Sequence, residues 1–512
     1  MTFTIFARVK NKKREMRKIY VEGEINSIRV GMCQISLSDT IVKRDDDTYI
    51  VKKNNPVVVY DTSGPYGDSS LNPDYKSGLP RMREAWYARR KDIVFNRGGE
   101  SSEDKKGVYR ARDKKCLTQM YYAKKRVISP EMEYVAIREN QQVEALGLKS
   151  YITPDFVRKE IASGRAVIPA NINHVEVEPM ILGSRFLVKI NCNLKIGKTF
   201  TEADHKKICF FCSSGVDALT EISYEDISST ARGFLVHNSP VPIRTQPIFQ
   251  ALAKVEGRVE ELTWEIYRDI LVNHMEQGVD FISVHGAMKR THTAMASNRL
   301  TGIVSQAGLI LSEWMKMRKE ENFLYTHFSE ICEIASSYDA VISIGSGLRP
   351  GSVYDANDRA HLAELSEMRG LVDIAWKQYA QIMAEGPGHI PMNKIKHYMK
   401  EYLYICKGIP FFSSGILTSD LAVGHEHIAA AISGAQVAWY GASLIGGFKN
   451  QADVSDLNLL HSDLLSYKIA AHSADLAKGH PGAQVRDNAF SKARYEKREN
   501  DWAKLLFGAA RK

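Results

Sequence analysis

The sequence predicts an α/β protein built around a parallel sheet, with a separate N-terminal domain and a C-terminal helical segment. From about residue 151, short apolar runs of strand length alternate with amphipathic helical segments, which is typical of a parallel sheet with helical crossovers. Residues 1–150 lack this alternation, and residues 456–512 have a helical pattern throughout. We therefore expect an N-terminal α+β domain over 1–150, the α/β body over 151–455 and a C-terminal helical segment over 456–512.

The composition indicates a globular protein with a sizeable core. Hydrophobic residues make up 44% and charged residues 25% of the 512 residues. No run approaches the roughly 18 apolar residues of a membrane helix, and the N-terminus lacks the apolar core of a signal peptide. The net charge of +9 comes from dispersed Lys and Arg, which favours a solvated basic surface over a nucleic-acid site. We expect a cytoplasmic protein with neither a membrane nor a nucleic-acid partner.

Within the first 150 residues, the stretch 61–80 is rich in Gly, Pro, Ser and Asp, so it predicts a long loop. Further along, helical segments such as 259–277 and 360–378 separate short apolar runs. The candidate strands are 166–170, 186–191, 217–222, 241–248, 280–285, 340–345, 380–384, 409–412 and 435–440.

The strand and helix pattern alone fits both a closed barrel and an open doubly wound sheet. No G-x-G-x-x-G or G-x4-G-K-[ST] sequence follows any candidate strand, so the usual support for a dinucleotide or P-loop site is missing.

The cysteines indicate a reducing compartment, because seven is an odd number and their spacing matches no disulfide scaffold. Only Cys209 and Cys212 form a C-x2-C pair. They lie on an apolar stretch that predicts the end of a helix before a strand, and we interpret them as core residues in preference to a metal or redox pair.

Six segments together resemble the phosphomethylpyrimidine synthase family of thiamine biosynthesis, and the resemblance runs over nearly the whole chain. They are 118–140 (TQMYYAKKRVISPEMEYVAIREN), 166–173 (AVIPANIN), 322–327 (NFLYTH), 347–352 (GLRPGS), 385–391 (EGPGHIP) and 477–484 (AKGHPGAQ). The resemblance implies a (β/α)8 barrel for the body of the chain. It also implies that the loop 61–80 lies near the active site, because DTSGPY and GLPR within it match the family.

In such barrels the functional side chains stand at the carboxyl ends of the strands, where the loops after the strands converge. Several residues here occupy those positions, and their convergence favours a site over separate structural roles. They are Asn191 and Asn193, then His285, then Gly347, Leu348 and Arg349, and last Glu385 and His389.

The family's substrate is aminoimidazole ribotide, and an Arg fork with backbone N–H groups suits its phosphate. Amide and carboxylate groups suit the ring and ribose, while a histidine can bond or shuttle a proton. The residues that match the family's substrate contacts are Asn193, His285, Ser305, Gly347, Leu348, Arg349 and Glu385.

The resemblance also implies a divalent metal, usually zinc, held by two histidines. His389 matches the first of them, but the segment around Gln451 and Ala452 offers no second histidine. Asp453 is a candidate oxygen ligand in its place, because zinc accepts carboxylate. We expect zinc binding at His389 to be weak.

The family's remaining cofactors are S-adenosylmethionine and a 4Fe-4S cluster held by a C-terminal C-x2-C-x4-C run. The printed sequence ends at Lys512 without that run, and Cys209 with Cys212 gives the first interval only. We therefore expect this chain to bind no four-iron cluster by itself.

The expected pocket also departs from the family pattern in several places. Thr220 stands where the family has Met, Phe249 and Phe412 replace tyrosines, and Ser346 replaces an aspartate. Gln306 and Ala307 replace an Arg-Gly pair after Ser305. Such changes predict an altered substrate, reaction or catalytic competence, because sites built to bond particular groups reject ligands that lack them.

Three functions follow as hypotheses. The first is conversion of the ribotide to hydroxymethylpyrimidine phosphate by radical chemistry, with a cluster from a partner subunit, as a homodimer or beside a full-length paralogue, or from a lost tail. The second is a diverged enzyme acting on the same ribotide, such as a benzimidazole synthase. The third is a non-catalytic ribotide-binding or regulatory protein.

Overall fold

The computed structural model of the protein describes residues 16–71, 73–88, 90–96, 107–114, 116–141, 151–223, 227–447 and 457–507. Its centre is a closed barrel in which each strand pairs in parallel with the next along the chain, and the last pairs with the first. The fold is therefore the expected (β/α)8 barrel. Its strands are β10 (Lys189–Leu194), β11 (Ala218–Glu221), β12 (Ile243–Thr245), β13 (Phe281–Val284), β14 (Val341–Ile344), β15 (Gln381–Gly386), β16 (Phe411–Ser414) and β17 (Leu444–Gly446).

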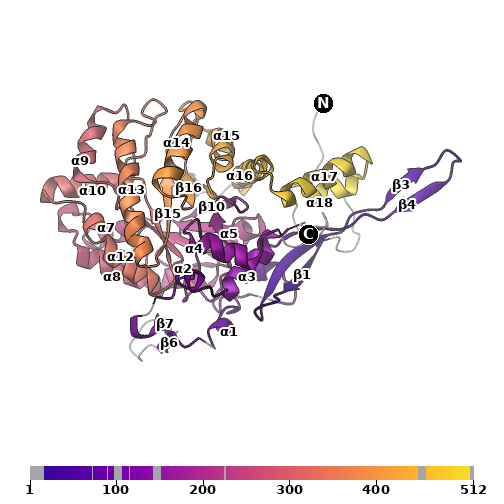
Figure 1. Ribbon diagram of the computed structural model, residues 1–512, viewed down its shortest axis with the longest axis horizontal. Coiled ribbons are helices and arrows are strands. Elements are labelled where there is room, and N and C mark those ends of the chain that lie inside the picture. Colours follow the sequence, from indigo (N-terminus) through magenta and orange to yellow (C-terminus); the bar gives the residue numbers. More distant parts are fainter. Residues whose placement is uncertain are drawn as a thin grey trace.

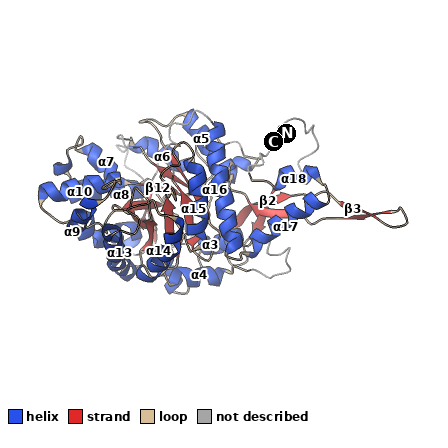
Figure 2. Cartoon of the chain, turned by 90° about the horizontal axis from the view of Figure 1, so that it is seen from above, coloured by secondary structure: helices blue, strands red, loops and turns tan. Residues whose placement is uncertain are grey.

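Helices cover the outside of this barrel (Figure 2). The longer ones are α5 (Glu202–Ser213), α6 (Ser229–His237), α7 (Pro247–Lys254), α8 (Trp264–Glu276), α10 (Gln306–Arg318), α12 (Phe328–Ser336), α13 (Arg359–Lys377), α14 (Met392–Ile405) and α15 (Glu426–Trp439). Short helices α9 (Arg290–Thr293) and α11 (Phe323–Thr326) lie between β13 and β14.

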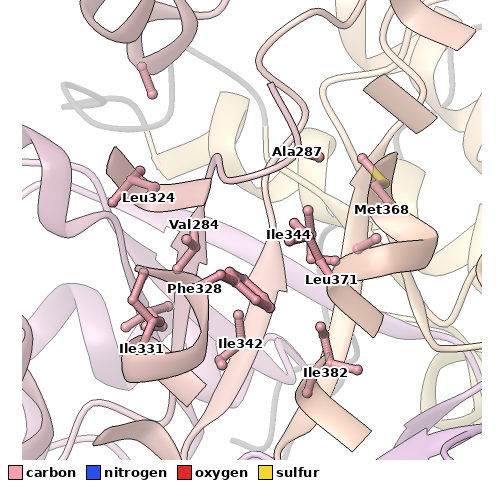
Figure 3. Packing of buried hydrophobic residues seen from close by; sticks show 14 of the residues in the cluster. Val284, Ala287, Leu324, Phe328, Ile331, Ile342, Ile344, Met368, Leu371 and Ile382 are labelled. Atoms are coloured by element: carbon pink, nitrogen blue, oxygen red, sulfur yellow. The ribbon is translucent and has the colours of Figure 1, made fainter. Parts of the chain in front are cut away.

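The largest hydrophobic core lies between the strands and these helices. Figure 3 shows Phe328 and Ile331 of α12 and Leu371 of α13 beside Val284 of β13 and Ile342 of β14. All five side chains are fully buried or nearly so, and burying each stabilises the fold by about 1.5 to 3 kcal/mol. This packing fixes the outward faces of the strands and leaves their alternate residues to fill the barrel.

The lower part of the barrel interior is an apolar plug. Strands contribute Ala218, Phe281, Val341, Met383, Phe412 and Leu444, and the segment below them contributes Val167, Met180 and Leu182. That segment contains the short antiparallel pair β8 (Ala166–Val167) and β9 (Leu182–Gly183), which closes the amino-terminal end of the barrel. The opposite end, formed by the carboxyl ends of the strands, is called the barrel mouth below.

The residues before the barrel form a small antiparallel sheet and helices. The sheet has the order β1 (Met16–Glu22), β2 (Arg29–Ile35), β5 (Val57–Tyr60). A hairpin of β3 (Thr40–Lys43) and β4 (Tyr49–Lys52) projects from the body (Figure 1). The other elements are α1 (Glu84–Tyr87), the pair β6 (Ile93–Asn96) and β7 (Val108–Ala111), α2 (Gln119–Lys124), α3 (Pro130–Glu139) and α4 (Pro154–Ala162).

The C-terminal helices run from the barrel back to the N-terminal sheet (Figure 1). They are α16 (Leu457–Ala477), α17 (Pro481–Tyr495) and α18 (Glu499–Leu505). Helix α16 packs against α15 and β10, while Ala493 and Leu505 pack with Ile35 and Val57 of the sheet. The last segment is therefore helical as expected. No helix among the described residues is long and apolar enough to cross a bilayer.

Four strand predictions are corrected by the structure. Residues 435–439 belong to α15, Tyr440 is its C-cap, and the closing strand is β17, because the chain leaves the helix only where Gly441 adopts a positive φ of 124°. The predicted strand 166–170 is reduced to β8, outside the barrel, and the predicted 186–191 begins three residues early relative to β10. The predicted 241–248 also runs too far, because Pro247 starts α7.

The loop 61–80 lies at the amino-terminal end of the barrel, which corrects its expected position near the active site. Tyr66 donates its hydroxyl hydrogen to the carbonyl of Asn238 (2.6 Å), and the N–H of Leu79 donates to the carbonyl of His237 (2.8 Å). Both carbonyls precede β12. A composition rich in Gly and Pro predicts a loop but does not say at which end of a barrel it lies.

A candidate active site at the barrel mouth

The predicted site residues do converge at the barrel mouth. Asn193 lies one residue before the end of strand β10, and His285 directly follows β13. Arg349 lies in the loop after β14. Glu385 is in the last part of β15, and the register joins Asn193 to Thr220 and Glu385 to Phe412 on the neighbouring strands. Because all the strands are parallel, these residues share one end of the barrel.

Above the apolar plug, Glu385 is the centre of a buried polar layer. Its Oε1 accepts hydrogen bonds from Ser283 Oγ (2.8 Å) and Ser343 Oγ (2.7 Å) and forms an ion pair with Arg244. Burial alone would raise the pKa of Glu385, but Arg244, His285 and these bonds outweigh it and lower the pKa below its usual value. The carboxylate is therefore charged and already has several partners.

Arg244, on β12, fills the space beside Glu385. Its guanidinium lies 5.3 Å from the centre of the Phe412 ring, a distance suited to a cation–π contact. Only 3% of Arg244 is exposed, so this charge is held inside the barrel by Glu385 and the ring. Phe412 belongs to the apolar plug, and its ring contacts Arg244 from below the polar layer.

His285 has an unmet hydrogen-bonding group. The side chain is buried, and its Nδ1 has no partner within the described part of the chain. Burial, together with the charges of Arg349 and Arg244, lowers the pKa of His285 to about 4, so the ring is neutral near pH 7. Gly345 leaves room for this ring, since a Cβ on Gly345 would lie 2.7 Å from its atoms. A buried ring nitrogen without a partner is what a polar ligand atom would satisfy.

The loop after β14 is organised around Glu364 of α13. Its carboxylate accepts from Ser346 Oγ (3.0 Å) and from the N–H groups of Gly347 (2.7 Å) and Leu348 (3.0 Å). In this structure a carboxylate therefore occupies the N–H groups that we expected to suit a phosphate. Burial raises the pKa of Glu364 to about 7 in spite of the three hydrogen bonds.

At the rim of the mouth, Arg349 and Ser305 both form hydrogen bonds with backbone groups three residues away in the sequence. One guanidinium N–H of Arg349 donates to the carbonyl of Ser346 (2.9 Å). Ser305 caps α10 by accepting from the N–H of Gly308 (3.2 Å), and Gln306 and Ala307 form the first turn of that helix. A Cβ on Gly308 would lie 2.4 Å from the carbonyl oxygen of Gly347, so α10 packs closely on the loop.

On the other side of the mouth, Thr220 donates its hydroxyl hydrogen to Asn191 Oδ1 (2.9 Å). Asn191 is fully buried, and its Nδ2 has no hydrogen-bond partner among the residues described. Phe249, on α7, is partly buried and packs against the large core. The mouth thus offers at least two unsatisfied polar groups, one on His285 and one on Asn191.

His389 lies beside Asp420, which the sequence prediction missed. Its Nδ1 and Asp420 Oδ1 are 2.8 Å apart, and Asp420 also accepts from the N–H of Val353 (3.0 Å). Although burial opposes it, the bond from His389 lowers the pKa of Asp420. Two ligands do not complete a zinc site, which takes at least three from the protein, and the described residues contain no group of three potential ligands. Asp453 lies outside the described residues.

The cysteines of the sequence do not fit a three-thiolate cluster site. All seven are described, none is disulfide-bonded, and Cys33, Cys192, Cys212, Cys332 and Cys406 are buried. Burial raises the pKa of Cys209 to about 11 and raises that of Cys212 well above its usual value, which disfavours the thiolate that iron needs. Both cysteines lie in α5, where Cys212 is buried in a hydrophobic cluster, in agreement with a core role. Cys209 is only partly buried, and its Sγ lies 3.8 Å from His205 Nε2.

Comparison with protein-family models shows to which family the chain is related. Residues 118–511 match the model of the radical SAM ThiC family, and residues 13–94 match the ThiC-associated domain. The chain belongs to the radical SAM ThiC family. ThiC proteins serve thiamine pyrimidine biosynthesis, and their family name implies S-adenosylmethionine and an iron–sulfur cluster. The cysteines of this ThiC family member do not supply that cluster site.

Dihydropteroate synthases are among the solved structures that show a weak resemblance to the chain. The dihydropteroate synthase from Vibrio fischeri ES114 is 10% identical, with a TM-score of 0.35 over 61% of this chain and 99% of that chain. The dihydropteroate synthase from Xanthomonas albilineans is 9% identical, with a TM-score of 0.31 over 59% of this chain and 96% of that one. These scores are too low to support an argument about ligand or reaction.

Sequence reasoning missed Arg244, Glu364 and Asp420. Arg244 gave a signal, because a charged residue stands between Ile243 and Thr245 inside a predicted buried strand. Glu364 falls inside a predicted amphipathic helix, where a glutamate is ordinary, and Asp420 lies in a loop with no distinguishing pattern.

Proposed function

We propose that the protein binds aminoimidazole ribotide at the barrel mouth, as a phosphomethylpyrimidine synthase-like member of the ThiC family. The observation that supports this most is the convergence of His285, Arg349 and Glu385 at the carboxyl ends of parallel strands in a chain of that family. The unsatisfied Nδ1 of His285 and Nδ2 of Asn191 add groups that a polar heterocycle and its ribose would satisfy.

The structure changes how the phosphate is held in this proposal. Because the N–H groups of Gly347 and Leu348 donate to Glu364, the phosphate rests on the guanidinium of Arg349. A guanidinium can donate two parallel hydrogen bonds to one phosphate, and its charge persists at all relevant pH values. Neutral His285 then orients the heterocycle and can accept or donate one proton.

Conversion of the ribotide to hydroxymethylpyrimidine phosphate depends on cofactors in this proposal. S-adenosylmethionine and a 4Fe-4S cluster supply radical chemistry when bound in the family. The seven cysteines of this chain are dispersed, so the cluster has to come from outside residues 1–512, for example from a partner subunit in a homodimer or from a full-length paralogue. The residues of this chain bind and orient the substrate.

A second candidate is a diverged or non-catalytic ribotide-binding protein. The ion pair between Arg244 and Glu385 favours it, because a carboxylate that already has Arg244, Ser283 and Ser343 as partners is less available to a substrate. A benzimidazole synthase-like reaction would share this altered pocket, whereas a regulatory protein would need only binding.

Calorimetric titration tests the binding proposal. The ligands are aminoimidazole ribotide, its dephosphorylated nucleoside and ribose 5-phosphate. Arg349→Ala should weaken ribotide binding by about 1.5 to 3 kcal/mol, roughly ten- to a hundredfold, because charge-assisted bonds are lost. It should leave nucleoside binding almost unchanged.

The matched control is Arg268→Ala, which removes an exposed arginine from α8, on the outside of the barrel. Equal affinity for ribotide and nucleoside would contradict the phosphate role of Arg349. Turnover of bound ribotide only after addition of a cluster-bearing paralogue would support the first candidate, and tight binding without turnover under those conditions would support the second.

A further inference from the structure

A cavity of about 550 Å³ lies on the amino-terminal side of the barrel, away from the barrel mouth. Its walls come from the N-terminal sheet, the starts of β10 and β11, and the helices α16 and α17. Its volume falls in the range of small-molecule sites. The apolar part of the wall includes Cys33, Ile35 and Val59.

The carboxylates around this cavity already have cationic partners. Asp217 pairs with Arg138, and Glu139 pairs with Lys189 (2.8 Å). In the same way Asp61 pairs with Lys18 (3.4 Å) and Asp475 pairs with Lys478 (3.0 Å). These pairs cancel their own charges, so they leave none to neutralise a further cation.

Two further cations line the cavity without a carboxylate in direct contact among the described residues, and Asp217 and Asp487 act on them only from a distance. Lys468, on α16, donates to the carbonyl of Ser214 (2.6 Å), and Arg486, on α17, donates to the carbonyl of Leu505 (3.1 Å). The ring of Phe507 contacts both, at 6.0 Å from Lys468 Nζ and 4.2 Å from Arg486 Cζ. The two like charges therefore face one space.

The pKa values of both cations reflect this arrangement. Burial and the neighbouring Arg486 lower the pKa of Lys468 to about 8, although Asp217 opposes the shift. Burial lowers the pKa of Arg486 to about 10. Both groups would thus be stabilised in their charged forms by an anion in the cavity.

We propose that this cavity binds a small phosphorylated ligand, with its phosphate held by Lys468 and Arg486. A guanidinium presents a fork of donors and an ammonium a compact charge, and the two together suit the several oxygens of a phosphate or diphosphate. The apolar residues of the wall pack against the rest of the ligand. This site is separate from the barrel mouth and does not depend on the proposed function.

The test uses calorimetric titration with inorganic phosphate and with pyrophosphate, in protein that carries Arg349→Ala so that the barrel mouth does not compete. We expect saturable binding in this background. Lys468→Gln or Arg486→Gln, each of which removes the charge but keeps a donor, should weaken it at least about tenfold. Arg494→Gln, an exposed arginine on the same helix as Arg486, is the matched control and should leave it unchanged.

Absence of saturable binding of both probes would overturn the proposal, and so would affinities equal in all three variants. Failure of Arg349→Ala to affect ribotide binding would contradict the barrel-mouth proposal alone, so the two failures are distinguishable.

A second measurement needs no change at Lys468. Inorganic phosphate is a dianion at about pH 8.5, and its binding should draw a proton onto Lys468, because an adjacent anion raises the pKa of an ammonium. Titrations in two buffers with different ionisation enthalpies detect this uptake, and its absence would contradict a contact with Lys468. The other titratable or charged groups that line the space are Cys33, Tyr60, Asp61, Tyr66, Arg138, Glu139, Lys189, Asp217, His461, His472, Asp475, Arg486 and Lys504.

Discussion

At the scale of single residues, the contact between Arg244 and Glu385 determines the character of the barrel interior. Each group is buried, and each would be costly to bury alone, because removal of one member of a buried pair leaves an uncompensated charge. The pair therefore has to be considered as a unit in any variant of the candidate site.

We predict that Arg244→Met lowers the free energy of unfolding by about 3 to 5 kcal/mol. The double variant Arg244→Met with Glu385→Gln should recover most of this loss, because no buried charge remains. Urea unfolding of the two variants and of Glu385→Gln measures the coupling. A double variant no more stable than Arg244→Met would contradict the interpretation.

Glu364 gives a prediction about pH. Its pKa is about 7 in the folded protein against an ordinary value of 4.5, so the folded state binds the proton more tightly than the unfolded state. This contribution to stability is complete below about pH 4.5 and is lost as the pH rises through about 7. Glu364→Gln lacks the titration, so its stability relative to the unaltered protein should rise across that window by at most about 3 kcal/mol.

Denaturant unfolding at several pH values between about 4.5 and 8 measures this difference. Glu313→Gln, at an exposed position on α10, controls for the loss of a charge. The pKa values of His285 and His361 are lowered to about 4 and about 3, so these histidines change stability with pH in the opposite direction to Glu364. Both histidines are present in every protein compared, so their effect cancels in the difference. A constant difference between Glu364→Gln and the unaltered protein would mean that Glu364 titrates normally.

At the scale of elements, whether a strand could be predicted from the sequence depends on the length of its apolar run and on the residues that flank the run. The run 340–345 predicts a strand correctly, because four apolar or small residues follow a turn and precede a glycine loop. The run 435–440 was misassigned because a short alternating segment cannot be distinguished from the end of a helix by its periodicity. The true closing strand, β17, has three residues and is too short for the pattern to reveal.

The orientation of a single side chain was less predictable than the element that carries it. The positions of Asn193, His285 and Glu385 at the carboxyl ends of strands could be predicted from the alternation of strands and helices together with the family resemblance. The partners of those residues did not, because whether Arg244 faces inward depends on the register between strands, and a shift of one residue would reverse it. The hydrogen bond from the N–H of Gly347 to Glu364 likewise depends on how α13 packs against the barrel.

Asp280 provides a prediction for how the elements are held together. This buried carboxylate, just before β13, accepts from the N–H of Asn171 (3.0 Å) and of Ile243 (2.7 Å) and contacts His174 Nδ1 (2.7 Å). It joins the segment below the barrel to β12. Although burial opposes it, Asp280 raises the pKa of His174 above its usual value.

We predict that Asp280→Ala lowers the free energy of unfolding by about 3 to 5 kcal/mol, because it leaves Nδ1 of His174 and two N–H groups buried without their carboxylate partner. Thermal and urea unfolding measure the loss. Asp269→Ala, an exposed aspartate on α8, is the control and should change stability by no more than about 0.5 kcal/mol. An effect of Asp280→Ala as small as that of the control would contradict the role.

At the scale of the whole molecule, the dispersed cysteines lead to a prediction about iron. Cys192 and Cys212 share one hydrophobic cluster and Cys209 lies next to Cys212 on α5, whereas Cys33, Cys116, Cys332 and Cys406 lie elsewhere in the fold. Even so, the described residues contain no group of three side chains that could hold a metal ion. We predict that anaerobic reconstitution of residues 1–512 yields no four-iron cluster, because no three thiolates meet. Iron and sulfide analysis with absorbance spectroscopy is the measurement, and about four irons per chain would contradict it.

The apolar plug has a consequence for the two proposed sites. Phe281, Phe412 and their neighbours form a buried apolar layer in the lumen, between the amino-terminal end of the barrel and the mouth. Strand β10 reaches both, with Lys189 in the wall of the cavity and Asn193 at the mouth, about 13 Å further along. We expect any heterotropic effect of one ligand on the other to appear as a small axial displacement of this strand against β11 and β17. Hydrogen exchange at the amides of β10 is therefore where such an effect would first be detected.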